Sequence, residues 1–211
     1  MQKGEMIRIT YTGKLKEGGH KFDGGDKVPV VVGAGFVIPG LDEALEHMQI
    51  GEKRTVEVLP DKGFGERNAE LMKIVPEAEM KRHNIQPQVG MPVEADGRRG
   101  RIMSTNSGRV TIDFNHPLAG KVLVYEVEVT GKVEGKEHKI SALIKFFANI
   151  EPSSVKVTGD TAEILIPPLL HPVVKKRIAD EIRKHAGVST IKFSEVFEKP
   201  KDDAEKEDHG A

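Results

Sequence analysis

The stretch 36–48 constrains the fold of this chain most, because it joins an apolar run to a short amphipathic segment. Its apolar residues recur at intervals of three and four, which is the spacing of one helix face: Leu41, Ala44, Leu45 and Met48. Gly51 suits the left-handed conformation that ends many helices, so we predict that the helix stops there. Val37 and Ile38 then lie at its N-terminal mouth. Taken alone, such a segment is most often a core helix packed on a sheet.

Composition limits the partners and the chemistry of the chain. Its 211 residues suffice for one compact core with smaller units, so we expect two or three domains. A formal net charge of -1 indicates no general attraction to nucleic acid or anionic lipid, and no apolar stretch is long enough for a membrane span. The absence of cysteine excludes disulfides, and the spacing of the 8 histidines fits no metal site. We therefore expect a cytoplasmic protein with no metal, no cofactor and no membrane partner.

Strand patterns on both sides of the helix predict a sheet. The segments that carry them are 7–11, 27–33, 53–59 and 122–130. A Glu-Gly-Gly turn after the first segment reverses the chain and brings Phe22 and Asp23 back beside Tyr11. From this segment alone, the simpler expectation is that the Asp23 carboxylate faces solvent or caps a turn. Phe64 lies in a glycine-hinged turn at 61–65, which fits either a flap over a pocket or a plain surface turn.

Beyond residue 71 the pattern changes to short strands and turn signals. The expected strands are 89–95, 100–104 and 109–114. Asp96-Gly97 and the turn 106–108 separate them as hairpin signals, which predicts a small β unit. From residue 138 we predict a third unit of mixed structure. Its expected elements are a strand at 138–147, a strand at 162–166, a helix at 172–186 and a strand at 190–197.

Five short motifs follow one another in an order that resembles the FKBP family of peptidyl-prolyl isomerases. They are Tyr11-Thr12-Gly13, Lys21-Phe22-Asp23, the stretch 36–48, Gly63-Phe64-Gly65 and Leu123-Val124-Tyr125-Glu126-Val127. The Asn-His-Pro-Leu-Ala-Gly turn at 115–120 resembles the end of the insert in the SlyD type, in which a small domain interrupts the flap. A C-terminal extension of this position and length is similar to that of the long archaeal members.

The resemblance implies an α+β fold, with an FKBP-like antiparallel sheet wrapped on a short helix, an inserted small β domain and a C-terminal α+β domain. The implied domain limits are 1–71 with 116–134 for the catalytic domain, 72–115 for the insert-in-flap domain and 138–198 for the C-terminal domain. Residues 199–211 are charged and lack aromatic side chains, so we expect a disordered tail there.

The resemblance also implies an activity, the cis/trans isomerisation of X-Pro bonds in unfolded or nascent polypeptides. The implied pocket residues are Tyr11, Phe22, Asp23, Val37, Ile38, Leu41, Phe64 and Tyr125. In these roles Asp23 and Tyr11 orient the amide and Phe64 closes the flap. No nucleophile is paired with a base among them, which suits a rotation that breaks no covalent bond. Many family members have tryptophan where Leu41 stands and tyrosine where Phe64 stands, which argues against tight macrolide binding.

We expect the insert to hold unfolded clients. Its apolar residues are more numerous than a small β unit easily encloses, and methionine adapts to varied partners. The expected client-binding residues are Ile74, Val75, Met80, Met91, Val93, Ile102 and Met103. Composition alone fits an ordinary small core almost as well, and the SlyD-like position favours an exposed groove for unfolded chains. The alternative function is a non-catalytic polypeptide-binding chaperone on an isomerase fold, and the retained Asp23 argues against it.

Local sequence patterns raise two further possible binding partners of the protein. Arg98, Arg99 and Arg101 form a basic loop that fits contact with nucleic acid or the ribosome, but the lack of an aromatic platform favours a solvated hairpin tip. The expected strand 138–147 is apolar on both faces, and one small helix cannot cover both. We therefore predict a homodimer formed through the C-terminal domain.

Overall fold

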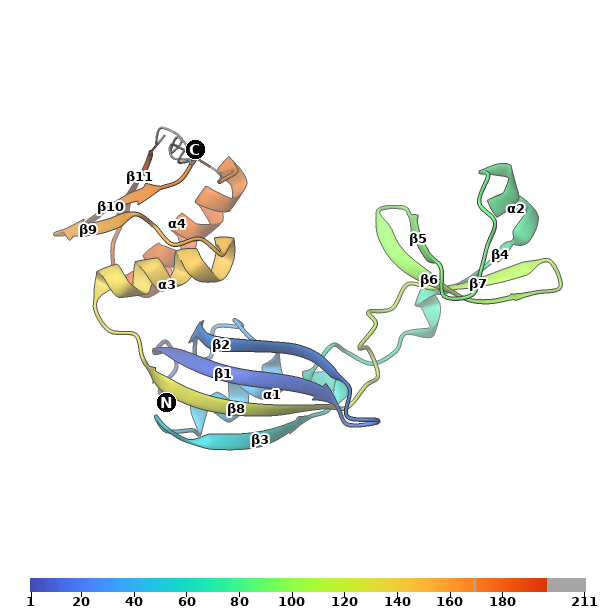
Figure 1. The fold of residues 1–211 in the computed structure, drawn as a ribbon, viewed down its shortest axis with the longest axis horizontal. Helices are drawn as coiled ribbons and strands as arrows, with labels where there is room; N and C mark the ends of the chain where they lie inside the picture. The colour runs from blue at the N-terminus through green and yellow to red at the C-terminus, as the bar shows by residue number, and fades with distance from the viewer. Residues whose placement is uncertain (169, 197–211) are drawn as a thin grey trace, which may run out of the picture.

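The structure is a computed structural model that describes residues 1–168 and 170–196, so the tail predicted at 199–211 lies outside the described residues. Figure 1 shows three bodies: a sheet with a short helix, a small sheet to one side of it, and a mixed unit of helices and strands. The α+β class predicted from the sequence is confirmed. Across the residues that the structure describes, no helix is both long and apolar enough to cross a bilayer.

A four-stranded antiparallel sheet forms the first body. In spatial order its strands are β2 (Lys21–Val31), β1 (Met6–Leu15), β8 (Leu123–Lys132) and β3 (Lys53–Val58). The strand that follows the insert therefore pairs between two strands that precede it. The helix α1 (Pro39–Glu46) packs on this sheet, where Leu41 and Leu45 are buried in one core with Ile9 and Val58.

The helix α1 ends at Glu46, which is earlier than the sequence predicts. Gly51 has a positive φ of 82°, as expected for a glycine in a left-handed turn. This turn, however, precedes β3, and the N–H of Gly51 donates to the Val129 carbonyl at 2.7 Å. Gly51 therefore aligns β3 with β8 and does not end the helix.

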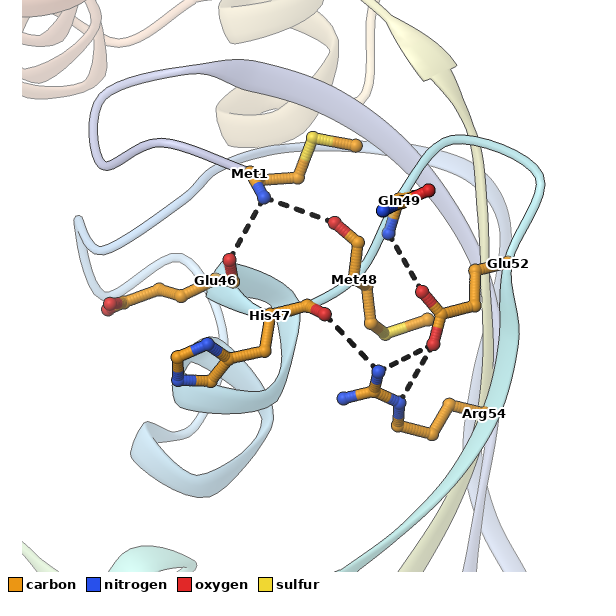
Figure 2. Close-up of polar contacts among 7 residues, drawn as sticks. All are labelled: Met1, Glu46, His47, Met48, Gln49, Glu52 and Arg54. Carbon is orange, nitrogen blue, oxygen red and sulfur yellow. Dashed lines mark hydrogen bonds and ion pairs between the residues drawn. The ribbon is translucent and has the colours of Figure 1, made fainter.

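Polar groups from outside the helix close the C-terminal end of α1. Figure 2 shows the residues of this cluster: Met1, Glu46, His47, Met48, Gln49, Glu52 and Arg54. The Met1 amino group donates to the Glu46 carbonyl at 2.9 Å and to the Met48 carbonyl at 3.1 Å. Arg54 donates to the His47 carbonyl at 3.2 Å. Positive groups at this end of a helix satisfy the free carbonyls and oppose the helix dipole favourably.

The second body is a small sheet that interrupts the chain between β3 and β8. In spatial order its strands are β4 (Met72–Pro76), β7 (Arg109–Asp113), β6 (Arg98–Asn106) and β5 (Pro92–Ala95), and the helix α2 (Glu77–Arg82) follows β4. Short 3-10 turns at Pro60–Lys62 and Ala69–Leu71 precede it. Asp96 and Ser107 have positive φ angles in the turns that join its hairpins, so the two hairpin predictions are confirmed.

The third body packs two helices on a three-stranded sheet. Its elements in chain order are α3 (Lys136–Ala148), β9 (Ser154–Thr158), β10 (Thr161–Ile166), α4 (Pro172–Ala186) and β11 (Thr190–Glu195). The central strand β10 pairs antiparallel with β9 and parallel with β11. Ile178 and Ile182 of α4 are buried in one core with Ile164 of β10. Figure 1 shows α3 between this sheet and the first body.

The prediction of a strand at 138–147 is wrong, because this segment belongs to the helix α3. Its dense apolar residues fit the strand period of two and the helix period of 3.6 equally. The length of the apolar segment is then the better guide, because long segments favour a helix. Asn149 ends the helix in a left-handed conformation with a φ of 53°. The side of α3 with Ile140 and Leu143 packs in the C-terminal core, and Phe146 packs against the first body. The homodimer stays a prediction, without the two exposed sheet faces from which it was inferred.

Candidate active site

A cavity of about 360 Å³ lies at the N-terminal mouth of α1. Its lining residues are Tyr11, Asp23, Gly35, Phe36, Val37, Ile38, Leu41, Phe64 and Tyr125. All of the pocket residues proposed from the sequence are in this set except Phe22, which lies behind the wall. Gly35 and Phe36 are additional lining residues that the motif pattern did not identify.

Aromatic rings from β1, β8 and the flap line the cavity, and the Phe22 ring of β2 packs behind them. The Phe22 ring stands edge-on to Tyr125, with centroids 5.8 Å apart, and edge-on to Phe64, with centroids 6.5 Å apart. Tyr11 and Tyr125 are tilted to each other at 6.0 Å. These separations lie in the range where aromatic pairs attract. The rings are therefore well packed, although Phe22 does not line the cavity itself.

Gly13 permits this close packing of rings. A Cβ atom at Gly13 would lie 3.0 Å from the rings of both Phe22 and Tyr125, which is closer than ordinary contact. Gly13 pairs with Asp23 on β2 and with Tyr125 on β8, so the residue stands between the two sides of the pocket. A larger side chain here would displace one of the rings.

The carboxylate of Asp23 is oriented by two hydrogen bonds. The Tyr11 hydroxyl donates to Oδ2 at 3.2 Å, and the Gly24 N–H donates to Oδ1 at 2.7 Å. Burial, and then the negative charge of Asp23, raise the pKa of Tyr11 to about 12 and that of Tyr125 to about 12. Both phenols are therefore protonated donors at neutral pH. Asp23 is exposed, in agreement with the simpler expectation that its carboxylate faces solvent. Its side chain nevertheless also lines the cavity.

The loop before α1 provides a backbone donor at the cavity. The buried carboxylate of Asp42 accepts the N–H groups of Gly33 at 2.8 Å and Gly35 at 3.1 Å, which fixes the loop. The Ile38 carbonyl accepts from Leu41 N–H at 3.0 Å at the first turn of α1. Within the described residues, the Ile38 N–H donates to no acceptor of the protein. This N–H is thus available for a ligand carbonyl.

The flap residue Phe64 stacks on His116, which lies in the turn at 115–120. The two rings are nearly parallel, with an interplanar angle of 4° and centroids 4.4 Å apart. Gly120 N–H donates to the Gly65 carbonyl at 2.8 Å, so the chain segments before and after the insert are joined at the flap. The sequence pattern identified the turn that contains His116 but not its contact with the pocket.

Two further contacts join these segments where the insert begins and ends. Asn68 and Asn115 bond reciprocally: the Asn68 N–H donates to Asn115 Oδ1 at 2.8 Å, and Asn115 Nδ2 donates to the Asn68 carbonyl at 3.0 Å. The Arg67 guanidinium forms an ion pair with Asp113. We call these four residues the insert neck. Its partners are far apart in the sequence, so no local signal could have paired them.

The residues proposed for client binding divide into core and surface. Met80 and Ile102 are buried and form the core of the insert with Val110 and Ile112, as the ordinary-core alternative requires. Val75, Met91 and Val93 pack partly buried against that core. The exposed members are Ile74, at 65% exposure, and Met103, at 43%, and Val89 is a further exposed apolar residue at 67%.

The basic residues of the insert are exposed. Arg98, Arg99 and Arg101 lie on β6, next to the hairpin turn that joins it to β5. The Arg99 guanidinium is 4.0 Å from the Glu94 carboxylate across the hairpin. An exposed pair at this distance contributes little stability.

A sheet wrapped on one short helix, with an aromatic hollow at the N-terminal end of that helix and no nucleophile paired with a base among the lining residues, suits a catalyst of bond rotation. A peptidyl-prolyl isomerase fits such a site, because rotation about an X-Pro bond needs an apolar hollow and fixed donors but no covalent chemistry. Sequence comparison gives the particular family: the chain belongs to the FKBP-type peptidyl-prolyl cis-trans isomerases. Residues 73–118 match the family model described as "FKBP26, IF domain", so the predicted insert-in-flap type is confirmed.

Three relatives carry this assignment. The chain is 36% identical over 111 residues to the probable FKBP-type 16 kDa peptidyl-prolyl cis-trans isomerase of Pseudomonas fluorescens, covering 49% of this chain and 73% of that one. It is 31% identical over 146 residues to the SlyD isomerase of Treponema pallidum, covering 66% and 82% respectively. It is also 36% identical over 104 residues to the short-type isomerase of Methanocaldococcus jannaschii, covering 49% and 66%. The predicted resemblance to SlyD is thus confirmed.

Proposed function

We propose that this isomerase acts on X-Pro bonds of unfolded or nascent polypeptides, in the cavity between β1, β2, β8 and α1. The observation that carries the proposal is the aromatic hollow with the free Ile38 N–H at its mouth. A hollow of about 360 Å³ accommodates a proline ring with its neighbouring atoms.

The absence of cysteine from the chain supports a cytoplasmic location.

The barrier to be lowered is that of amide resonance, about 18–20 kcal/mol. An apolar aromatic wall disfavours the charge-separated planar amide more than the less polar twisted one. The Ile38 N–H is placed to hold a flanking carbonyl of the client, while the Tyr11 hydroxyl and the Asp23 carboxylate orient the amide. Weakening resonance by about 5 kcal/mol would accelerate rotation by about four orders of magnitude.

A protease-free isomerisation assay on a short proline peptide tests this activity. The parent protein should accelerate the exchange, and Tyr125→Ala should lower the rate because the ring forms part of the cavity wall. Thr130→Ala is a matched control on the same strand, since its exposed side chain bonds the Arg8 carbonyl away from the cavity. A parent protein without activity would favour the alternative, a non-catalytic chaperone on an isomerase fold.

We further propose that the insert binds unfolded clients through its exposed apolar residues and so acts as a chaperone. Ile74, Val89 and Met103 support this, because apolar side chains this exposed are typical of interaction surfaces. A client held there is tethered beside the pocket, and its encounter with the pocket becomes intramolecular. Short peptides gain nothing from such tethering.

Deletion of the insert separates the two activities. Because Asn68 and Asn115 bond to each other, replacing residues 69–114 by a short turn keeps both ends in place. Short-peptide isomerisation should stay near the parent rate, while proline-limited refolding of a whole protein slows and suppression of aggregation is lost. If the truncated protein refolds such clients as fast as the parent, the insert has a structural role only. The triple change I74S/V89S/M103S should reproduce the refolding defect without altering the insert core.

A further inference from the structure

The joint between the first sheet and the C-terminal domain is a shared apolar core. The linker from β8 to α3 is short, and within it Val133 N–H donates to the Met6 carbonyl at 2.8 Å. Met6 and Val31 of the first sheet are buried in the same cluster as the core residues of the C-terminal domain. Phe36 packs against this cluster and also against the core around α1. The two bodies are therefore packed together and not merely tethered.

The ring of Phe36 is surrounded by both helices of the C-terminal domain. Its centroid lies 4.7 Å from Phe146 and 5.6 Å from Phe147, both on α3. His185 of α4 stands edge-on to it at 5.8 Å. Arg177 lies over the Phe147 ring, 4.8 Å from its centroid. Aromatic pairs at these separations attract beyond their area burial, so the ring has a defined position.

The same residue belongs to the isomerase cavity. Phe36 lines the cavity directly before Val37 and Ile38, the residue whose N–H is free. Asp42 fixes the start of this loop through two backbone hydrogen bonds, at 2.8 and 3.1 Å. The loop thus has one anchor in α1 and a second anchor, through Phe36, in another domain.

We propose that the C-terminal domain positions the mouth of the isomerase pocket, with Phe36 as the positioning residue through which it acts. Without its aromatic partners, the Phe36 side chain would sample more conformations, and the Ile38 N–H would meet a client carbonyl in fewer of them. Displacements of about 1 Å at a reacting site can reduce a rate by about 100-fold, so a partial loosening is measurable. The proposal rests on the proposed location of the active site.

The test uses the full chain and two matched aromatic substitutions in the C-terminal domain. Phe146→Ala removes a ring that contacts Phe36, whereas Phe193→Ala removes a ring of β11 that packs against the same C-terminal core. Phe146→Ala should lower kcat/KM for a short proline peptide about tenfold, mainly by raising KM, because the loop carries a binding donor. It should also speed amide hydrogen exchange in residues 33–38. Phe193→Ala should leave both quantities at the parent values.

Phe146→Leu keeps apolar contact and should restore most, but not all, of the lost kcat/KM. If Phe146→Ala does not fold, Phe146→Leu should still show a measurable loss of kcat/KM and faster exchange in residues 33–38, and parent values of both would overturn the proposal. A folded Phe146→Ala protein with parent kcat/KM and parent exchange in 33–38 would overturn the proposal. Equal losses in Phe193→Ala would also overturn it, because the effect would then reflect general loosening of the domain. A parent protein inactive in the same assay would count against the proposed active site, and the exchange rates would still decide whether α3 holds the loop.

Discussion

Replacing Asp23 by asparagine should lower isomerisation of a short proline peptide about tenfold without unfolding the protein. The carboxylate accepts hydrogen bonds from the Tyr11 hydroxyl at 3.2 Å and from the Gly24 N–H at 2.7 Å. A hydrogen bond to a charged group contributes about 1.5–3 kcal/mol. The Tyr11 bond is long and Asp23 is exposed, so the loss lies at the lower end of this range. A change of about 1.4 kcal/mol in the activation barrier corresponds to a factor of ten in rate.

The same variant can be followed by alkaline titration of tyrosinate absorbance. The chain contains 2 tyrosines, Tyr11 and Tyr125, and both line the cavity, so the signal comes from the site alone. Burial is the main cause that raises the pKa of Tyr11 to about 12, and the charge of Asp23 is the second cause. Asp23→Asn should therefore move the pKa of Tyr11 down toward its ordinary value of 10.0, and burial should keep it above that value.

Asp26→Asn is the matched control for this variant. Asp26 lies on the same strand and is exposed, and it accepts the Thr10 hydroxyl hydrogen bond at 2.8 Å outside the cavity. It should change neither the rate nor the titration. A folded Asp23→Asn protein with parent kcat/KM and an unchanged tyrosine titration would refute the assigned role of the carboxylate.

Three further outcomes follow from the described contacts. The pKa of Tyr11 and of Tyr125 is about 12 in the folded protein and 10.0 ordinarily, so the unfolded state releases these protons first as pH rises. The free energy of unfolding, measured by urea denaturation, should therefore fall as pH rises from 10 to 12. Asp42→Ala leaves two backbone N–H groups without their acceptor, so it should lower the free energy of unfolding in urea by about 2–4 kcal/mol. A loss smaller than the error of the fit would show that other contacts hold the loop. Asn115→Ala removes both reciprocal bonds to Asn68, so it should slow proline-limited refolding of a whole protein more than it slows isomerisation of a short peptide. Equal effects on the two rates would contradict a role of this contact in orienting the insert.

The strands of the first sheet could be predicted because their signals are local, whereas the pocket residues on them were implied by the resemblance of the motifs to the FKBP family. Alternation along β1 and β8 places Tyr11 and Tyr125 on the inner face, and the apolar stripe of α1 requires that face to be covered. The insert was less predictable, since an apolar residue such as Ile102 fits a client surface and a small core equally by composition. Its burial distinguishes the two, and burial depends on the whole sheet.

In the segment of α3, the periodicity of apolar residues cannot distinguish a helix from a strand. Where nearly every residue is apolar, the spacing of Ile140, Leu143 and Ile144 fits a helix as well as alternation fits a strand. The helix forms because packing is available on two sides, against the C-terminal sheet and against Phe36 through Phe146. Neither surface is visible to a pattern read within a few residues.

The sequence by itself determined the elements around the pocket, the order of motifs that defines an FKBP-type isomerase, and the presence of an insert in the flap. These depend on side-chain spacing and turn residues that act over a few positions. Only the tertiary structure decided which groups meet across long separations. Arg67 and Asp113 are 46 residues apart and form an ion pair at the insert neck, and Phe36 meets α3 at the mouth of the pocket. Such pairs form because the folded sheet brings distant segments together, so they depend on packing and not on local pattern.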